Sequence, residues 1–425
     1  MAGSDRLTER HGTRMTSDDI ARLVDGADIG EATAGVAIGR TISMRESNRL
    51  LRLERVSLHR KVWVCVIVLV VLVFLSLGIM GAAGQYYVYT AAYTDYSPLQ
   101  VLNVLCEHAY NAIAQLTHQY PEHTNAWLLE NVPGYWAIAQ RAGVIGVTLV
   151  CAVLLSVSGM LYQNVFKNPI AGPGMLGVSS GVSIGMMLLV VLYSGAAMSM
   201  IKERYLFCYG FGAAILLFVI VAGRKLSGKD RPFDTVTMLL VGAILGQLIG
   251  FVVNYVTLFV MSDEDYATFF TISQMLTIDT SAISWLSLGV ASLLSFIPVF
   301  LLRYQMNGLA FDDEEARLLG INPGRLRGIA LVCGAIMILA AQVHTGMVGL
   351  ISLIVPYLSR SLFGCEFSKQ LVGNTCLGTI LLLICRDITD LIPFVGDGLA
   401  IGSVVSIVAL PLLVLMMAKQ MRGWE

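Results

Sequence analysis

The chain has 425 residues, of which 56% are hydrophobic and only 13% are charged. Soluble domains carry about 25% charged residues, so this composition excludes an ordinary soluble protein. The net charge of -1 leaves no large cationic face, which argues against nucleic acid as a partner.

The N-terminal part of the chain is polar, and the first long apolar run begins only near Trp63. A secretory signal peptide would occupy the very start of the chain. We therefore expect residues 1–61 to form a cytosolic extension and residues 62–425 to form the membrane domain.

Apolar runs then recur along the chain and approach the length of about 20 residues that a membrane-spanning helix needs. Backbone polar groups in lipid have to be satisfied within the segment, which favours helices over open strands. The sequence thus predicts an all-α, polytopic membrane protein with about ten transmembrane helices. Within one run, Gly242, Gly246 and Gly250 recur every four residues, a pattern of close helix contacts in membranes. The predicted spans are 62–82, 142–163, 174–195, 206–223, 236–260, 284–302, 326–342, 347–363, 371–386 and 399–418.

The charges in the predicted loops indicate an orientation. The loops 224–231 and 303–327 are rich in Lys and Arg, whereas 262–280 contains acidic residues and no basic one. Cytoplasmic loops carry the excess of Lys and Arg. We therefore expect the basic loops to lie in the cytoplasm, and an even number of spans places both termini there too.

The long segment 84–140 is expected on the outer side of the membrane. It contains His108, His118 and His123 among several tyrosines. The spacing of its histidines and acidic residues is not that of a tight metal site. We favour a solvated extracytoplasmic cap over a metal site, and we predict no metal and no cofactor for the chain.

The sequence indicates no energy source for transport within the chain itself. Residues 223–230 come close to a phosphate-binding loop, but Asp230 stands where Ser or Thr would reach magnesium, and the stretch follows a membrane helix. An ion-coupled secondary transporter needs ionisable groups near mid-bilayer, and the predicted spans almost lack them. We expect a non-enzymatic transport subunit driven by a partner, and keep a secondary transporter and a receptor without transport as alternatives.

The segment 158–181 breaks the helical pattern at membrane depth. Pro169 and Pro173 cannot continue a helix, while Gly172 and Gly177 permit tight turns. Non-helical backbone at this depth is tolerated where it is buried in protein or lines a water path. The segment therefore predicts a permeation pathway.

The same segment resembles the pattern SGxxxQxxxxNPLAxPxxLGxxxGA of the iron-chelate and cobalamin (FecCD-type) permeases of binding-protein-dependent ABC importers. Gly172 replaces the usual Asp. The resemblance covers about 142–418 and implies a type II ABC importer permease fold. The matching residues are Ser158, Gly159, Gln163, Asn168, Pro169, Ala171, Pro173, Leu176, Gly177 and Gly181. The residues expected on the translocation pathway are Gln163, Asn168, Pro169, Pro173 and Gly177.

A second match lies in the predicted cytoplasmic segment 309–323. It is expected to be a short polar helix, with acidic residues at its start, as the helix dipole favours, and with Gly320 and Pro323 stopping it. It resembles the family's coupling helix, which docks into a cleft on the ATPase subunit. The expected coupling residues are Asp313, Glu314, Glu315, Ala316, Arg317, Leu319 and Gly320.

A third match, residues 346–360, looks like the family's GxIGFVGLIVPHLAR stretch. Ser352 stands for a glycine and Tyr357 for the histidine, whereas Pro356 and Arg360 are retained. The end of the chain is similar but looser.

Docking of a solute-binding protein is implied by the resemblance. The family presents arginines on its outer face, and Arg141 stands where one of them would lie, although Val144 occupies the usual second position. Such exposed charges steer and orient a partner. The other outer cations expected to take part are Lys202, Arg204 and Arg386.

These features together predict the permease subunit of an ABC importer in the cell membrane. The expected partners are two ATPase subunits, a solute-binding protein and a second permease, either the same chain or a relative. Transport is expected to proceed by alternating access. A ferric siderophore is the first choice of substrate, followed by haem and cobalamin.

Overall fold

A computed structural model of the chain describes residues 44–78, 135–169, 171–197, 199–227, 235–274, 280–346, 348–391 and 401–422. Its contacts divide the chain after Val64, within helix α3 (Met44–Gly78), into two parts. In the first part, the side chains of Val56, Trp63 and Val64 are exposed. The second part contains all the other described helices.

A helix lies on each predicted span, and the described ranges contain helices but no strand, which confirms the all-α prediction. Seven of these helices are long and apolar enough to cross a membrane, and shorter apolar helices accompany them. The helices on the predicted spans after α3 are α6 (Tyr135–Phe166), α7 (Val178–Leu192), α8 (Ile201–Ser227), α9 (Thr235–Phe259), α11 (Ala282–Leu301), α13 (Pro323–Thr345), α14 (Ile351–Phe363), α15 (Phe367–Leu391) and α16 (Ile401–Arg422).

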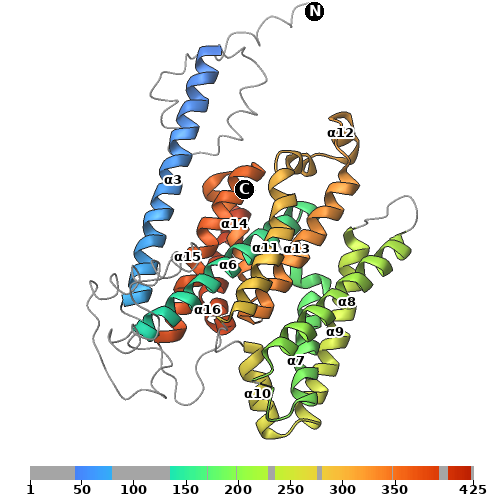
Figure 1. Ribbon diagram of the computed structural model, residues 1–425. Coiled ribbons are helices and arrows are strands. Elements are labelled where there is room, and N and C mark those ends of the chain that lie inside the picture. The colour runs from blue at the N-terminus through green and yellow to red at the C-terminus, as the bar shows by residue number, and fades with distance from the viewer. Residues whose placement is uncertain are drawn as a thin grey trace, which may run out of the picture. The chain divides into compact units, whose positions relative to one another are not determined.

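Helices α6 and α13 form the core of the second part, and α6 also packs on α14 and α15 (Figure 1). Tyr162 on α6 is fully buried, and its hydroxyl donates a hydrogen bond to the Leu331 carbonyl of α13 (3.1 Å). A side chain on Gly334 would overlap the Tyr162 ring, and one on Gly159 would overlap the Ser352 carbonyl. Small residues therefore let these helices approach closely, as is common in membranes.

Helices α7, α8 and α9 form a neighbouring group. Gly181 and Gly185 of α7 lie directly against the backbone of α8. In α9, Gly242 and Gly246 lie against the backbone that precedes and begins α7, whereas an added Cβ on Gly250 meets no atom within 4 Å. The predicted close contact is therefore confirmed for the first two glycines of the repeat and wrong for Gly250.

Helix α10 (Asp263–Gln274) lies in the acidic loop and was not predicted. Ser262 caps its start, since its hydroxyl accepts a hydrogen bond from the Asp265 N–H (3.2 Å). Hydrogen bonds from the hydroxyls of Ser194 (2.7 Å) and Ser262 (2.8 Å) hold the pKa of the Asp265 carboxyl below its usual value.

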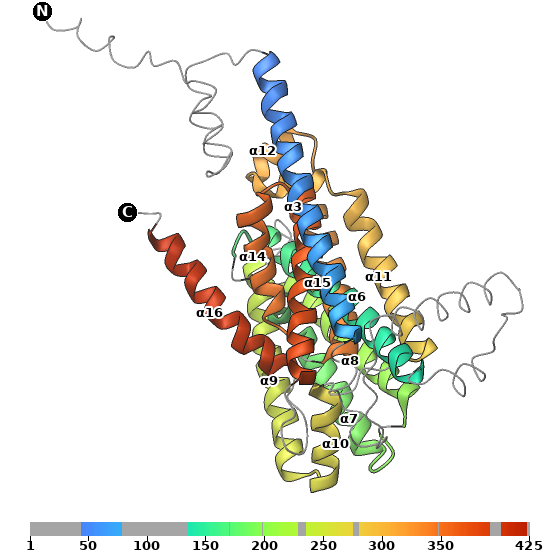
Figure 2. The same ribbon diagram turned by 90° about the vertical axis from the view of Figure 1, so that its left-hand side faces the viewer.

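The segment 309–323, predicted to lie in the cytoplasm, contains a shorter helix than expected. A 3-10 helix, η4 (Gln305–Ala310), leads to α12 (Asp313–Leu318), which has six residues instead of extending over 309–323. The extended Asp312 precedes α12, and Gly320, in the left-handed region (φ 75°), ends the turn that follows it. Figures 1 and 2 show α12 and α10 at opposite ends of the second part.

Candidate functional site

The backbone between α6 and α7 leaves helical geometry where the sequence predicted a break. α6 ends at Phe166, and Lys167 takes a left-handed conformation (φ 48°). The 3-10 helix η3 (Pro173–Leu176) follows, and Gly177 (φ 72°) precedes α7. The predicted non-helical stretch is thus confirmed.

The five predicted pathway residues do not share one surface. Gln163 is 1% exposed, and its amide nitrogen donates a hydrogen bond to a backbone carbonyl of α14 (2.9 Å). Pro173 and Gly177 are buried, Pro169 is half-buried and Asn168 is exposed. Most of this motif therefore packs inside the protein.

The motif packs on α9. A side chain on Gly177 would meet the Gly242 carbonyl, and one on Gly242 would overlap the backbone of Leu176 in η3. The Ser180 hydroxyl donates a hydrogen bond to the Gly246 carbonyl (3.2 Å). The motif thus fixes one face of α9 and leaves its other face uncovered.

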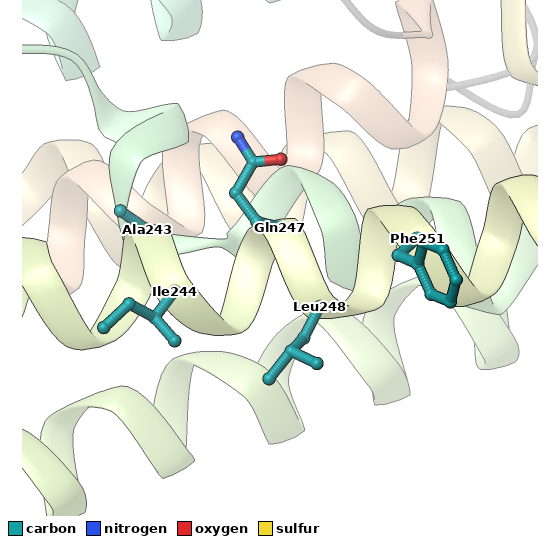
Figure 3. A pocket seen from close by; sticks show the side chains of 5 residues that line it. All are labelled: Ala243, Ile244, Gln247, Leu248 and Phe251. Atoms are coloured by element: carbon teal, nitrogen blue, oxygen red, sulfur yellow. The ribbon is translucent and has the colours of Figure 1, made fainter.

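The uncovered face of α9 combines apolar and amide side chains. Gln247 and Asn254 are both exposed, and their separation of seven residues puts them on the same side of the helix. Figure 3 shows that Gln247 points away from Ile244 and Leu248 around the same turns of α9. A shallow hollow of about 490 Å³ on this helix is lined by Ala243, Ile244, Gln247, Leu248 and Phe251.

Amide groups on a membrane-spanning helix are costly against lipid, because hydrocarbon cannot hydrogen-bond to them. The free face of α9, defined by Ala243, Gln247, Gly250 and Asn254, is therefore suited to water or to another protein. The sequence contained this signal, since two amides seven residues apart interrupt an apolar run. The face was nevertheless not predicted, because the glycines of the same run indicate helix packing.

The second half of the site is residues 305–320, which contain the residues predicted to couple to an ATPase and are named the coupling segment below. Asp313 of α12 pairs with Arg327 of α13 through both guanidinium nitrogens, with Nη1 donating to Oδ2 at 3.1 Å and Nη2 donating to Oδ1. This bidentate hydrogen bond from Arg327 lowers the pKa of the Asp313 carboxyl. The pair anchors the start of α12 to the N-terminal end of α13.

The rest of α12 points outward. Of the predicted coupling residues, Ala316 is fully buried, and Glu314, Glu315, Arg317, Leu319 and Gly320 are exposed. Leu318, which was not among them, is 89% exposed. Exposed leucines beside acidic side chains at a water-facing helix are typical of a protein contact. The structure therefore places the predicted coupling residues next to one another, in α12 and in the turn that follows it.

The predicted docking residues are mostly inside the protein. Arg141 is 9% exposed, and its Nη2 lies 3.1 Å from Asp387 Oδ1 of α15 and 3.3 Å from the Ser76 hydroxyl of α3. The Ser76 hydroxyl also donates to Asp387 (2.6 Å). Arg141 therefore joins three helices, which corrects its assignment to an exposed docking surface.

The other predicted docking residues differ in their exposure. Arg204 and Arg386 are also buried, and the Arg204 guanidinium lies 5.3 Å from the centre of the Tyr205 ring. Lys202 is exposed. Of the four predicted cations, only Lys202 has the exposure that docking requires.

A buried histidine was also missed, because the predicted span ended at residue 342. His344 of α13 is 2% exposed, and hydroxyls of α8 and α11 flank both ring nitrogens. Nδ1 lies 3.0 Å from the Ser284 hydroxyl, and Nε2 lies 3.1 Å from the Ser287 hydroxyl. His344 thus joins three helices at the end of α13 away from α12.

Comparison with known proteins agrees with these features. Residues 95–419 match the FecCD transport family. The hemin transport system permease protein HmuU of Yersinia pestis is 31% identical over 245 residues, which cover 56% of this chain and 70% of HmuU. The Fe(3+) dicitrate transport system permease protein FecC of Escherichia coli (strain K12) is 27% identical over 276 residues, 64% of this chain and 80% of FecC.

The fold also matches a solved structure. A protein assigned to the metal-chelate type ABC transporters, in an inward-facing conformation, superposes with a TM-score of 0.63 at 20% identity and covers 85% of this chain and 99% of its own. This likeness confirms the expected permease fold. Because the family match extends over most of the sequence, the chain belongs to the FecCD transport family and is a multi-pass membrane permease.

Proposed function

We propose that this chain is the permease subunit of an ABC importer that moves an iron chelate into the cytoplasm, with the energy supplied by separate ATPase subunits. The observation that carries the proposal is the free face of α9. It exposes Gln247 and Asn254 on a membrane-spanning helix, backed by the motif that this family shares. A second permease copy facing it would enclose a water-filled path between the two.

The lining of this path suits a large, weakly held cargo. The described part of the free face carries amide, small and apolar side chains but no charged one. Such a surface offers few strong contacts, so the chelate can be released as easily as it enters. Selectivity then lies mainly in the solute-binding protein. A ferric siderophore is the first choice of cargo, followed by haem and cobalamin, in keeping with the hemin and dicitrate relatives.

The charged residues at the two ends of the membrane helices support an orientation with α12 in the cytoplasm. Arg317, Arg325 and Arg327 lie at the α12 end, and α10 at the opposite end begins with three acidic residues. The end richer in arginine belongs in the cytoplasm, because Lys and Arg and not net charge set the orientation. There α12, with Glu315 and Leu319 exposed, would enter the ATPase subunit, and closure of an ATPase pair would tilt the helices that line the path.

Reconstitution tests this function. The chain is placed in vesicles with its ATPase and solute-binding protein, and uptake of a radiolabelled ferric siderophore is measured. We expect uptake that requires ATP, stops with vanadate and is insensitive to ion gradients. Concentrative uptake by the chain alone, driven by a proton or sodium gradient, would identify a secondary transporter instead.

A further inference from the structure

Besides the packing of its buried side chains, the coupling segment is held to the membrane helices by hydrogen bonds and ion pairs of three side chains in the described part of the chain. Asn307 Oδ1 accepts a hydrogen bond from the Phe367 N–H at the start of α15 (2.8 Å). Arg327 of α13 binds Asp313. The third attachment is Lys167, which follows α6 directly and begins the motif that packs on α9.

Lys167 reaches the coupling segment with its amine. Nζ donates a hydrogen bond to the Phe311 carbonyl (2.8 Å) and lies 3.3 Å from Asp312 Oδ1. Among the described residues, Lys167 is the one non-glycine with a positive φ. An L-residue adopts this conformation at a cost in free energy. Here it turns the chain out of α6 and towards η3.

A continuous set of contacts leads from Lys167 to α9. The Ala171 N–H donates to the Asn168 carbonyl (3.1 Å), and the Met175 N–H donates to the Gly172 carbonyl (3.1 Å), so the linker is a hydrogen-bonded unit. Its end, η3, lies against the backbone of Gly242. The exposed Gln247 follows little more than one helical turn further along α9.

We propose that Lys167 is a positioning residue that transmits the movement of α12 to α9, and so links the ATPase contact to the translocation path. The inference rests on the proposed function of the chain. An exposed ion pair contributes little to folding stability. The Lys167 side chain is 40% exposed and Asp312 is 89% exposed, so this contact serves the position of α12 and not the fold.

The two remaining attachments, at Asn307 and Asp313, hold α12 in place when the Lys167 amine is removed. Its loss therefore loosens the connection between α12 and the motif while α12 still presents Glu315 and Leu319 to the ATPase. The expected signature is ATP hydrolysis that no longer produces transport.

The test uses Lys167→Met, which keeps the aliphatic stem and removes the amine, and Lys167→Arg, which restores a cation. Lys369→Met is the matched control, because Lys369 forms a partly exposed ion pair with Glu366 (3.1 Å) at the start of α15. The full complex is reconstituted, and ATP hydrolysis and siderophore uptake are measured together. We expect Lys167→Met to lower uptake per ATP roughly threefold to tenfold at a nearly unchanged rate of hydrolysis, with Lys167→Arg recovering most of it.

A double-mutant cycle of Lys167→Met with Asp312→Asn completes the test, and the two effects should be clearly less than additive. Unchanged coupling in Lys167→Met, or an equal loss in Lys369→Met, would overturn the inference while leaving the proposed function intact. Absence of ATP-driven uptake by the unaltered complex would overturn both.

Discussion

Helices α13 and α9 are both long and apolar, yet they occupy opposite environments. In α13, residues from Leu331 to Thr345 are mostly buried, whereas α9 exposes a row of side chains along its length. Hydropathy alone therefore does not separate a buried core helix from a helix with an uncovered face. The difference lies in small residues that admit neighbours, such as Gly334, and in polar residues on an uncovered face, such as Gln247.

The largest effect is expected in the α13 core. Tyr162→Ala removes a fully buried ring that packs on Gly334 and a hydrogen bond to Leu331. We expect a loss of about 3–5 kcal/mol in stability, because the close-packed surroundings cannot collapse into the space. Thermal unfolding of the purified protein in detergent measures it. Tyr162→Phe is the control and should cost only about 1 kcal/mol; equal losses in both variants would show that packing of the ring contributes little to stability.

A smaller effect is expected where α9 meets the motif. Gly242→Ala places a methyl group into the backbone of Leu176, whereas Gly250→Ala adds one to open space in the same helix. We expect Gly242→Ala to destabilise by about 1–3 kcal/mol and to lower uptake, and Gly250→Ala to leave the midpoint of unfolding nearly unchanged. Similar unfolding midpoints for the two variants would contradict the close packing of α9 on η3.

The smallest effect on stability is expected at the N-terminal end of α13. Asp313→Asn removes the ion pair with Arg327, and a partly exposed pair contributes about 1 kcal/mol or less. Because the folded-state pKa of Asp313 is lowered, its contribution is present above its unfolded pKa, about 4, and is lost as the pH falls through the lowered value.

An acid titration of stability checks this sign. The unaltered chain and Asp313→Asn should differ at neutral pH; the difference should shrink as the pH falls below about 4 and vanish below the lowered folded-state pKa of Asp313. A difference that persists unchanged at acid pH would show that the carboxylate charge is not involved. Asp313→Asn should also lower ATP-driven uptake clearly, although it changes stability little, since the pair positions α12.

The sequence predicted the helices well because each long apolar run forms a helix, although α7 and α14 are shorter than a full span. Helix α10 was missed, although Ser262 and Asp265 form a recognisable helix start, because hydropathy does not reveal a polar helix. The break after α6 was predicted from Pro173 and Gly177, whose backbone requirements are local.

The rest could not be predicted because it depends on residues far apart in the chain. From its sequence position, Arg141 is predicted to be an exposed docking residue. In the structure its guanidinium pairs with Asp387, which is 246 residues away in the chain. The hydroxyls around His344 come from two other helices. Which face of α9 stays uncovered depends on where η3 and α7 pack against it. The sequence of α9 alone does not indicate this.

The central requirement of the proposed translocation path is that the free face of α9 is accessible to water. Gln247→Cys, in a chain whose eight native cysteines are replaced, would be treated with a charged, membrane-impermeant thiol reagent in the assembled complex. Leu286→Cys is the control, because Leu286 is 68% exposed on the apolar helix α11. We predict rapid labelling at position 247 that changes with bound nucleotide, and little at 286. Labelling at 247 only by a lipid-soluble reagent would contradict a water-filled path along α9.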